Sequence, residues 1–142
     1  MKHSETQKFA LAAIALALVS GVAYAQTTKL DLGKQEYLEN CAVCHAPSGK
    51  GGGPYVDFLR KSPPDLTQLT KTNGGVFPVN RVYETIEGAN VPSHGSRDMP
   101  IWGQDYRIKA AEYYVDVPYD PEPYVRARIL TLLEYINRLQ ER

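Results

Sequence analysis

Apolar residues near the carboxyl end of the chain recur at steps of three and four residues, which is the spacing of one face of an α-helix. The residues with this spacing are Val125, Ile129, Leu132, Leu133, Ile136 and Leu139. Such a stripe is typical of a helix with one side packed against a protein core. Asp120 and Pro121 come just before it and match the preferred cap and first position of a helix. The pattern therefore predicts a terminal helix capped by Asp120.

Shorter segments with helical spacing precede this helix, and loops rich in glycine and proline separate them. They are expected from about Leu30 to Cys44, after Asp65 through Leu69, after a cap at Asn80 through Ile86, and from about Asp105 to Val115. Gly88 stands where a helix end favours a left-handed residue. No stretch shows the alternation of a convincing β-strand. We therefore expect an all-α fold of about five short helices and irregular loops.

The amino terminus has a different pattern. An apolar run from Phe9 to Val19 follows Lys2 and Lys8, and the small-residue site Ala23-Tyr24-Ala25 comes before Gln26. A basic start, a short apolar run and a small-residue site together indicate a secretory signal peptide. The run is well short of the roughly 20 residues that span a bilayer, which disfavours an uncleaved membrane anchor. We expect residues 1–25 to be removed and residues 26–142 to form one domain, although such a signal also serves secretion in eukaryotes.

Composition and charge narrow the functional classes. The sequence has 16 basic and 16 acidic residues, and removal of Lys2, Lys8 and Glu5 leaves 14 and 15, a net charge of about −1. The remaining 117 residues, 142 minus 25, are enough for one compact domain and too few for two typical ones. Near-neutral charge gives no indication of a nucleic-acid partner. We expect neither nucleic-acid binding nor stable insertion into a membrane.

The strongest chemical motif is Cys41-Ala42-Val43-Cys44-His45. CxxCH is the attachment signature of a c-type haem, in which both thiols bond covalently to the porphyrin and the histidine ligates the iron. A bare CxxC also occurs in zinc sites, redox dithiols and structural disulfides. Zinc is short of ligands here, because the chain has two cysteines and three histidines, one of them His3 in the expected signal peptide. The flanks lack the βαβ context of a thioredoxin-like site, so a disulfide is the main alternative to one covalent haem c.

With this motif early in its mature part, the chain resembles class I monohaem cytochromes c over nearly all of the mature sequence. The resemblance implies a cytochrome c fold wrapped around one covalent haem, with a methionine downstream of the motif as an iron ligand. Gly33 and Tyr37 resemble the glycine and aromatic residue that let the family's first helix cross the terminal helix closely. Leu132 and Tyr135 resemble the opposing pair on the terminal helix.

The resemblance also implies a set of residues around the haem. Pro54 resembles the proline whose carbonyl accepts a hydrogen bond from the proximal imidazole, which would hold His45 in orientation. The segment Pro64-Asp65-Leu66 resembles the loop that packs beside the haem. The expected haem environment further includes Trp102, Arg81 and Arg97. The arginines would neutralise the haem propionates, and the tryptophan would pack on the haem or its loop and donate its indole N–H to a propionate.

Composition limits the choice of the sixth iron ligand. The chain has two methionines, and Met1 leaves with the expected signal peptide, so Met99 is the one thioether of the mature chain. It precedes Pro100 in a loop, which resembles the family's setting for the axial methionine. His94 is the mature chain's other histidine besides His45 and is the competing ligand. A thioether would raise the reduction potential, whereas a second imidazole would lower it.

The resemblance implies a one-electron carrier, not an enzyme, whose iron cycles between Fe(III) and Fe(II) with both axial ligands kept. Covalent haem attachment in bacteria is completed outside the cytoplasm, so we expect the periplasm. The partners would be redox proteins: a periplasmic dehydrogenase or reductase, a terminal oxidase or a membrane complex. Two alternatives stay open. One is a haem subunit of a periplasmic dehydrogenase complex with the tyrosine-rich segment 103–124 as its interface, and the other is a haem sensor or peroxidase with a labile sixth ligand.

Overall fold

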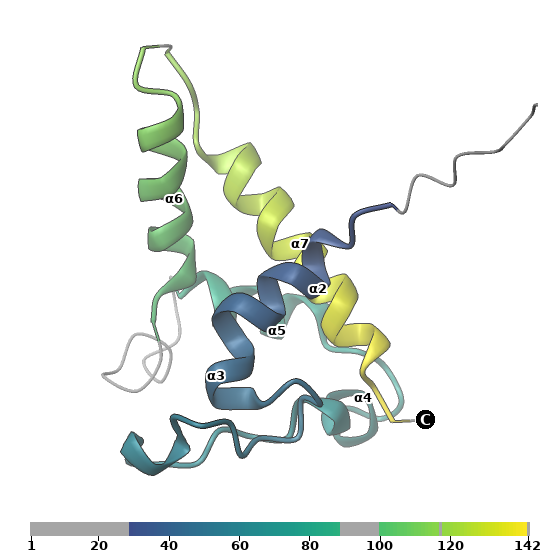
Figure 1. Ribbon diagram of the computed structural model, residues 1–142. Helices are drawn as coiled ribbons and strands as arrows, with labels where there is room; N and C mark the ends of the chain where they lie inside the picture. Colours follow the sequence, from purple (N-terminus) through teal and green to yellow (C-terminus); the bar gives the residue numbers. More distant parts are fainter. Residues whose placement is uncertain (1–28, 89–99, 117, 142) are drawn as a thin grey trace, which may run out of the picture. The chain divides into compact units, whose positions relative to one another are not determined.

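Helices and loops make up the part of the chain that the computed structural model describes, residues 29–88, 100–116 and 118–141 (Figure 1). In chain order the elements are α2 (Leu32–Glu36), η1 (Tyr37–Cys41), α3 (Ala42–His45), η2 (Val56–Phe58), η3 (Leu66–Gln68), α4 (Leu69–Thr72), α5 (Val79–Glu87), α6 (Trp102–Tyr113) and α7 (Glu122–Arg138). η1 is a π-helical segment, and η2 and η3 are 3₁₀ turns. These ranges contain no β-strand, which confirms the all-α prediction.

All of these elements belong to one unit, residues Asp31–Arg142. Among the described helices, none combines the length and the apolar character needed to cross a membrane.

Among the described helices, the first and the last, α2 and α7, cross at very close range (Figure 1). A Cβ atom added to Gly33 would lie 2.0 Å from the backbone oxygen of Thr131, so only a glycine fits at this crossing. One turn further along, the rings of Tyr37 and Tyr135 are in contact, with their centroids 5.1 Å apart. Tyr37, Leu132 and Tyr135 are all buried. The helix crossing implied by the family resemblance is confirmed.

The terminal helix α7 supplies the largest share of the core, as its apolar stripe predicts. Its buried side chains include Val125, Ile129, Leu132, Leu133 and Ile136. They form one cluster with residues of the other helices, among them Tyr37, Val82, Ile86 and Tyr106. Burial of one such aliphatic side chain contributes roughly 1.5–3 kcal/mol to stability. Packing against α7 therefore holds α2, α5 and α6 around a shared core.

Several predicted helix ends are confirmed by backbone geometry. Asp65 caps η3, because its Oδ1 accepts a hydrogen bond from the backbone N–H of Thr67 at 2.8 Å. Gly88 ends α5 in the left-handed conformation with a φ of 82°. Asp120 Oδ1 accepts a hydrogen bond from the N–H of Glu122, the first residue of α7, at 3.0 Å, although Pro121 and not Asp120 stands at the N-cap position. In each case a short polar side chain or a glycine satisfies the unpaired backbone groups of a helix end.

Two predicted helix starts were wrong. Asn80 does not cap α5, which begins at Val79 after Pro78, and the Pro78 carbonyl accepts the N–H of Val82 at 3.0 Å. The fixed φ of proline brings the chain into the helix before the asparagine is reached. The helix α6 begins at Trp102 rather than near Asp105. The partly buried Trp102 packs against the core, which accounts for this early start. The polar residues after Trp102 give no sign of it in the sequence.

Three ion-paired side chains tie α5, α6 and the start of α7 together. Arg107 on α6 contacts Glu87 of α5 through Nη2 at 2.6 Å, and Glu122 of α7 through Nε at 2.6 Å. Past the end of α6, the rings of Tyr114 and Tyr119 stack with their centroids 3.8 Å apart. The tyrosine-rich segment 103–124 therefore covers most of α6, the connection after it and the start of α7, and these two helices form a hairpin (Figure 1).

We predict that Gly33→Ala destabilises the haem-bound protein by about 3 kcal/mol or more, because the new methyl group would overlap the α7 backbone. Denaturant unfolding monitored by circular dichroism measures the loss. Gly74→Ala is the matched control, since its Cβ would meet no atom within 4 Å and only the positive φ of 66° would be strained, at a cost of about 1–2 kcal/mol. A Gly33→Ala protein at least as stable as the Gly74→Ala protein would contradict the close crossing.

Candidate functional site

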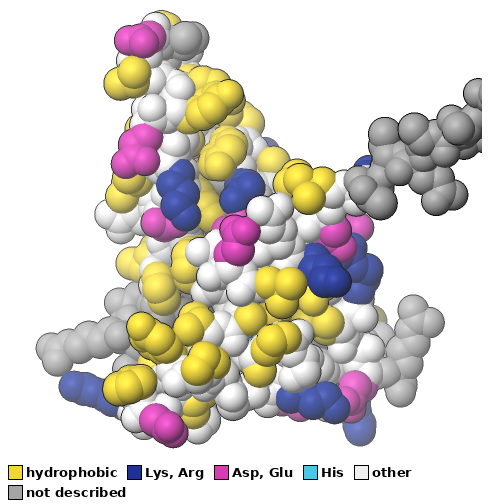
Figure 2. All heavy atoms as spheres, viewed as in Figure 1, with side chains coloured by type: hydrophobic (Ala, Val, Ile, Leu, Met, Phe, Trp, Pro, Cys, Tyr) yellow, Lys and Arg dark blue, Asp and Glu magenta, His cyan; other side chains and the backbone are white. Residues whose placement is uncertain are grey.

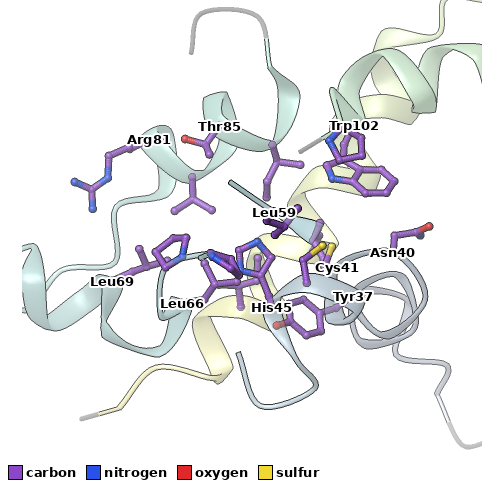
Figure 3. Close-up of a pocket in the computed structure, with 18 of the residues that line it drawn as sticks. Tyr37, Asn40, Cys41, His45, Leu59, Leu66, Leu69, Arg81, Thr85 and Trp102 are labelled. Atoms are coloured by element: carbon purple, nitrogen blue, oxygen red, sulfur yellow. The ribbon is translucent and has the colours of Figure 1, made fainter. Parts of the chain in front are cut away.

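A cavity of about 460 Å³ lies between α3, the loop before η3, α5, the start of α6 and α7. This volume falls in the range of roughly 300–1,000 Å³ that is usual for cofactor and ligand sites. Figure 3 shows His45 in the middle of the site, near Leu66 and Cys41, with Arg81 and Trp102 toward opposite sides. Most of the lining is apolar, so the site is suited to a large hydrophobic group with a few polar attachments.

The CxxCH motif lies at the end of a continuous helical run, with η1 followed directly by α3. Cys41, Cys44 and His45 all line the cavity, as the sequence predicts. The first thiol comes from the last residue of the π-helical segment, and the imidazole comes from the last residue of α3. π-Helical turns inside helices occur frequently at functional sites.

A glycine-rich loop folds back along the motif and fixes its backbone. After Ala46, four backbone N–H groups of the loop donate hydrogen bonds of 3.0–3.1 Å to the carbonyls of residues 43–46. The donors are Gly49, Gly51, Gly53 and Tyr55. A Cβ on Gly53 would lie 2.4 Å from the Val43 oxygen, so the two backbones are in direct contact there. The loop therefore supports the motif through the main chain.

Both thiols of the motif are free cysteines in the structure. Burial raises the pKa of Cys41 to about 12, with a smaller contribution from the negative charge of Glu36, and burial also raises the pKa of Cys44. Redox-active CxxC sites have the opposite property, a lowered thiol pKa that favours the nucleophilic thiolate. The environment of Cys41 and Cys44 thus disfavours the dithiol alternative.

His45 is buried, and its Nδ1 has no hydrogen-bond partner of ordinary geometry in the described residues. Burial lowers the pKa of His45, and the backbone carbonyl of Pro64 acts in the opposite direction with a smaller effect. The imidazole is therefore held in its neutral form, the form that ligates metals. Within the described ranges, no group of three or more His, Cys, Asp or Glu side chains is placed to hold a metal ion.

The proline beside the imidazole is Pro64, so the prediction for Pro54 is corrected. Pro64 lines the cavity and its backbone carbonyl lies at His45, whereas Pro54 is not part of the cavity wall. The reason lies in the preceding loop, because Gly53 and Tyr55 are still bonded to Cys44 and Val43 on the back of the motif. The chain needs a further loop before it returns to the imidazole.

The predicted haem environment is only partly within the described residues. Trp102 and Arg81 line the cavity. The ring centroids of Trp102 and Tyr106 are 6.3 Å apart. Met99, its competitor His94, and Arg97 fall outside the described residues. Lys61 also lines the cavity, and sequence reasoning missed it. Its sequence signal is the basic pair that it forms with Arg60 directly before Ser62-Pro63-Pro64.

The charges on the described part of the wall match the polar edge of a haem. Lys61 and Arg81 line the cavity, while no aspartate or glutamate of the described residues does so. Lys61 and Arg81 are both exposed, so these two cations lie at the edge of the cavity that faces water. Two cations at that edge suit the two carboxylates of the haem propionates, because opposite charges attract. The donor set therefore fits haem c: two thiols, one buried imidazole beside the Pro64 carbonyl, and two cations at the edge of an apolar wall.

A buried polar network next to the cavity was not predicted. Glu36 on α2 is 3% exposed and forms an ion pair with Arg128 of α7. Its Oε1 accepts hydrogen bonds from the hydroxyl of Tyr106 at 2.8 Å and from Nδ2 of Asn40 at 2.7 Å. The available sequence signal is that Glu36 follows Gly33 by three residues and so shares the helix face that meets α7.

The family model described as Cytochrome c matches residues 30–112, which is more than half of the 142-residue chain and includes the CxxCH motif. Comparison with curated proteins and with solved structures found no match. The all-helical fold, the helix crossing at Gly33 and the donor set of the cavity agree with the family match. The chain therefore belongs to the cytochrome c family, whose members carry electrons on a covalently bound haem c.

Proposed function

We propose that this protein is a periplasmic one-electron carrier with a single haem c attached through Cys41 and Cys44. In this proposal His45 is one axial ligand of the iron and Met99 is the other. The observation that carries the proposal is the placement of both thiols and a buried, neutral imidazole on the wall of one cavity. The haem supplies the one-electron change between Fe(III) and Fe(II).

The protein side chains bind the cofactor and limit the access of water. Apolar residues such as Leu66, Leu69 and Ile86 form the walls against which the porphyrin would pack. Lys61 and Arg81 would pair with the propionates. Because the thiols and the imidazole come from the adjoining elements η1 and α3, and the glycine loop is bonded to the backbone of the motif, their positions would change little when the charge of the cofactor changes.

The described residues that follow Met99 support it as the second ligand. Pro100 and Trp102 both line the cavity, so the chain borders the site immediately after the methionine. His94 is five residues further away along the sequence. Thioether ligation would favour Fe(II) and place the protein at the higher-potential end of the range for such haems.

Exposed apolar side chains next to the cavity support transient contact with a redox partner. Figure 2 shows hydrophobic side chains gathered on the surface of the molecule. Tyr55 is 57% exposed and Phe58 is 78% exposed, and Leu59, next in sequence, lines the cavity. Redox encounters commonly use small interfaces, which allows rapid release of the partner.

A second function, a haem subunit of a periplasmic dehydrogenase complex, is favoured by the end of the α6–α7 hairpin. Tyr113 is 81% exposed there, beside the stacked pair Tyr114 and Tyr119. Exposed aromatic side chains are enriched in stable interfaces. Purification from the native host at low and high salt distinguishes the two functions, because a free carrier elutes alone in both and a subunit retains a second chain.

We predict that the haem of the wild-type protein resists extraction by acidified organic solvent, because two thioether bonds hold it. Mass spectrometry of the denatured protein should show the polypeptide plus one haem. Replacement of both Cys41 and Cys44 by serine should give the polypeptide mass alone. Haem that can be extracted from the wild-type protein would exclude the c-type attachment.

We predict that the reduced wild-type protein keeps its visible spectrum in the presence of carbon monoxide, because both axial positions are occupied. Met99→Ala should form a carbon monoxide adduct, whereas His94→Ala should behave as the wild type. The reverse result for the two variants would assign His94 as the ligand. Rapid adduct formation by the wild type would instead support a sensor or peroxidase.

We predict that the exported protein begins at Gln26, because the signal peptide would be cleaved after Ala25. The intact mass of the protein recovered from the periplasm of a bacterial host measures this end. Ala23→Arg, which changes the small-residue site, should leave the precursor uncleaved. A product that retains residues 1–25 and sediments with membranes would show that the apolar run is an anchor.

A further inference from the structure

The buried network of Glu36, Asn40, Tyr106 and Arg128 lies directly behind one wall of the cavity. Asn40 lines the cavity, and its Nδ2 donates to Glu36 Oε1 at 2.7 Å. Tyr106 donates to the same oxygen at 2.8 Å, and its ring neighbours that of Trp102, which also lines the cavity. One or two side chains thus separate the Glu36 carboxylate from the space in which the haem would lie.

The two charged members of this network differ in their access to water. The side chain of Glu36 is 2% exposed and that of Arg128 is 30% exposed. The guanidinium lies over the rings of Tyr106 and Tyr124, 5.8 Å from each centroid. Water screens an exposed charge more than a buried one, so the field of Arg128 is weakened more than that of Glu36. Inside the cavity, the negative charge is expected to dominate.

The field of Glu36 already acts on the wall of the cavity. After burial, the charge of Glu36 is the largest contribution that raises the pKa of Cys41. Cys41 supplies a sulfur through which the haem would be attached, and it lies five residues after Glu36 on the same helical run. A charge whose effect reaches this sulfur acts on the porphyrin bonded to it as well.

We infer that the charges of Glu36 and Arg128 set the reduction potential of the haem. The negative charge of Glu36 favours Fe(III), and the positive charge of Arg128 favours Fe(II). Reduction transfers one electron from the redox partner to Fe(III), gives Fe(II) and lowers the charge of the haem by one. A nearby negative charge disfavours this step, and a nearby positive charge favours it. The inference rests on the proposed attachment of the haem through Cys41 and Cys44.

A purely structural role for the network is the alternative. The ion pair and the Tyr106 hydrogen bond join α2, α6 and α7, so their removal could simply loosen the core. Loosening of the core would move the potential in one direction for every variant, because each would admit more water to the haem. An electrostatic role predicts opposite signs for variants that weaken or strengthen the negative charge. The sign of the shift therefore separates the two roles.

The test uses mediated redox titration of the full, haem-loaded protein, followed by its visible spectrum. Glu36→Gln should raise the reduction potential by about 59 mV, a tenfold change in the electron-transfer equilibrium. The double variant Glu36→Gln with Arg128→Gln should show a smaller rise, because the opposing positive charge is also gone. Tyr106→Phe should lower the potential by an amount that corresponds to a few-fold change in the same equilibrium, because the Glu36 carboxylate loses a hydrogen-bond donor that offsets part of its negative charge.

Matched controls come from exposed positions on the same helices. Glu134→Gln on α7 removes a carboxylate whose side chain is 73% exposed, and Tyr113→Phe on α6 removes an exposed hydroxyl. Both should keep the wild-type potential. If Glu36→Gln does not fold, the double variant decides the sign, because it leaves no unpaired charge in the core and should still raise the potential, whereas a loosened core would lower it.

The outcomes separate this inference from the proposed function. If the wild-type haem is extractable, the attachment through Cys41 and Cys44 fails, and the inference fails with it. If the haem is covalent and Glu36→Gln has the wild-type potential, or if all variants shift it downward, the inference alone is overturned. Opposite shifts for Glu36→Gln and Tyr106→Phe, with both controls unchanged, support it.

Discussion

The backbone contact between α2 and α7 at Gly33 is the constraint on which the rest of the structure depends. It brings the backbones of α2 and α7 into direct contact, so that only the hydrogen atom of a glycine fits between them. Because the CxxCH motif follows on the same helical run as Gly33, this contact also sets where the thiols and the imidazole lie relative to α7. The helical run from α2 to α3 is fixed to α7 at Gly33, and it carries the cofactor-binding residues at its carboxyl end.

The chemistry of the site comes from burial more than from the residue types alone. The same burial raises the pKa of Cys41 and lowers that of His45, so both side chains are neutral in the folded protein near pH 7. Thiols with raised pKa values are poor groups for thiol–disulfide exchange in water. In the proposed attachment, two thioether sulfurs and a neutral imidazole carry no charge that has to be desolvated when the porphyrin packs against them.

The features that sequence predicts well are those encoded by local patterns. The stripe of α7, the cap at Asp65 and the left-handed Gly88 each follow from a few neighbouring residues. The features that it predicts poorly depend on distant parts of the chain. The choice of Pro64 over Pro54 depends on the path of a loop, and the burial of Glu36 depends on partners 70 and 92 residues away. A glutamate in a helical pattern is usually solvent-exposed, so the sequence around Glu36 gives no reason to expect its burial in the core.

The glycine loop behind the motif has a consequence for how freely the sequence can vary. Its contacts with residues 43–46 are made by main-chain atoms, and such bonds do not depend on which side chains are attached. Gly52 has open space around its Cβ position and is restricted only by its positive φ, so asparagine is a tolerable replacement there. Gly53 has an ordinary φ but no space, so every other residue is excluded. Two adjacent glycines thus accept different substitutions, and natural variation in this loop should be uneven from one residue to the next.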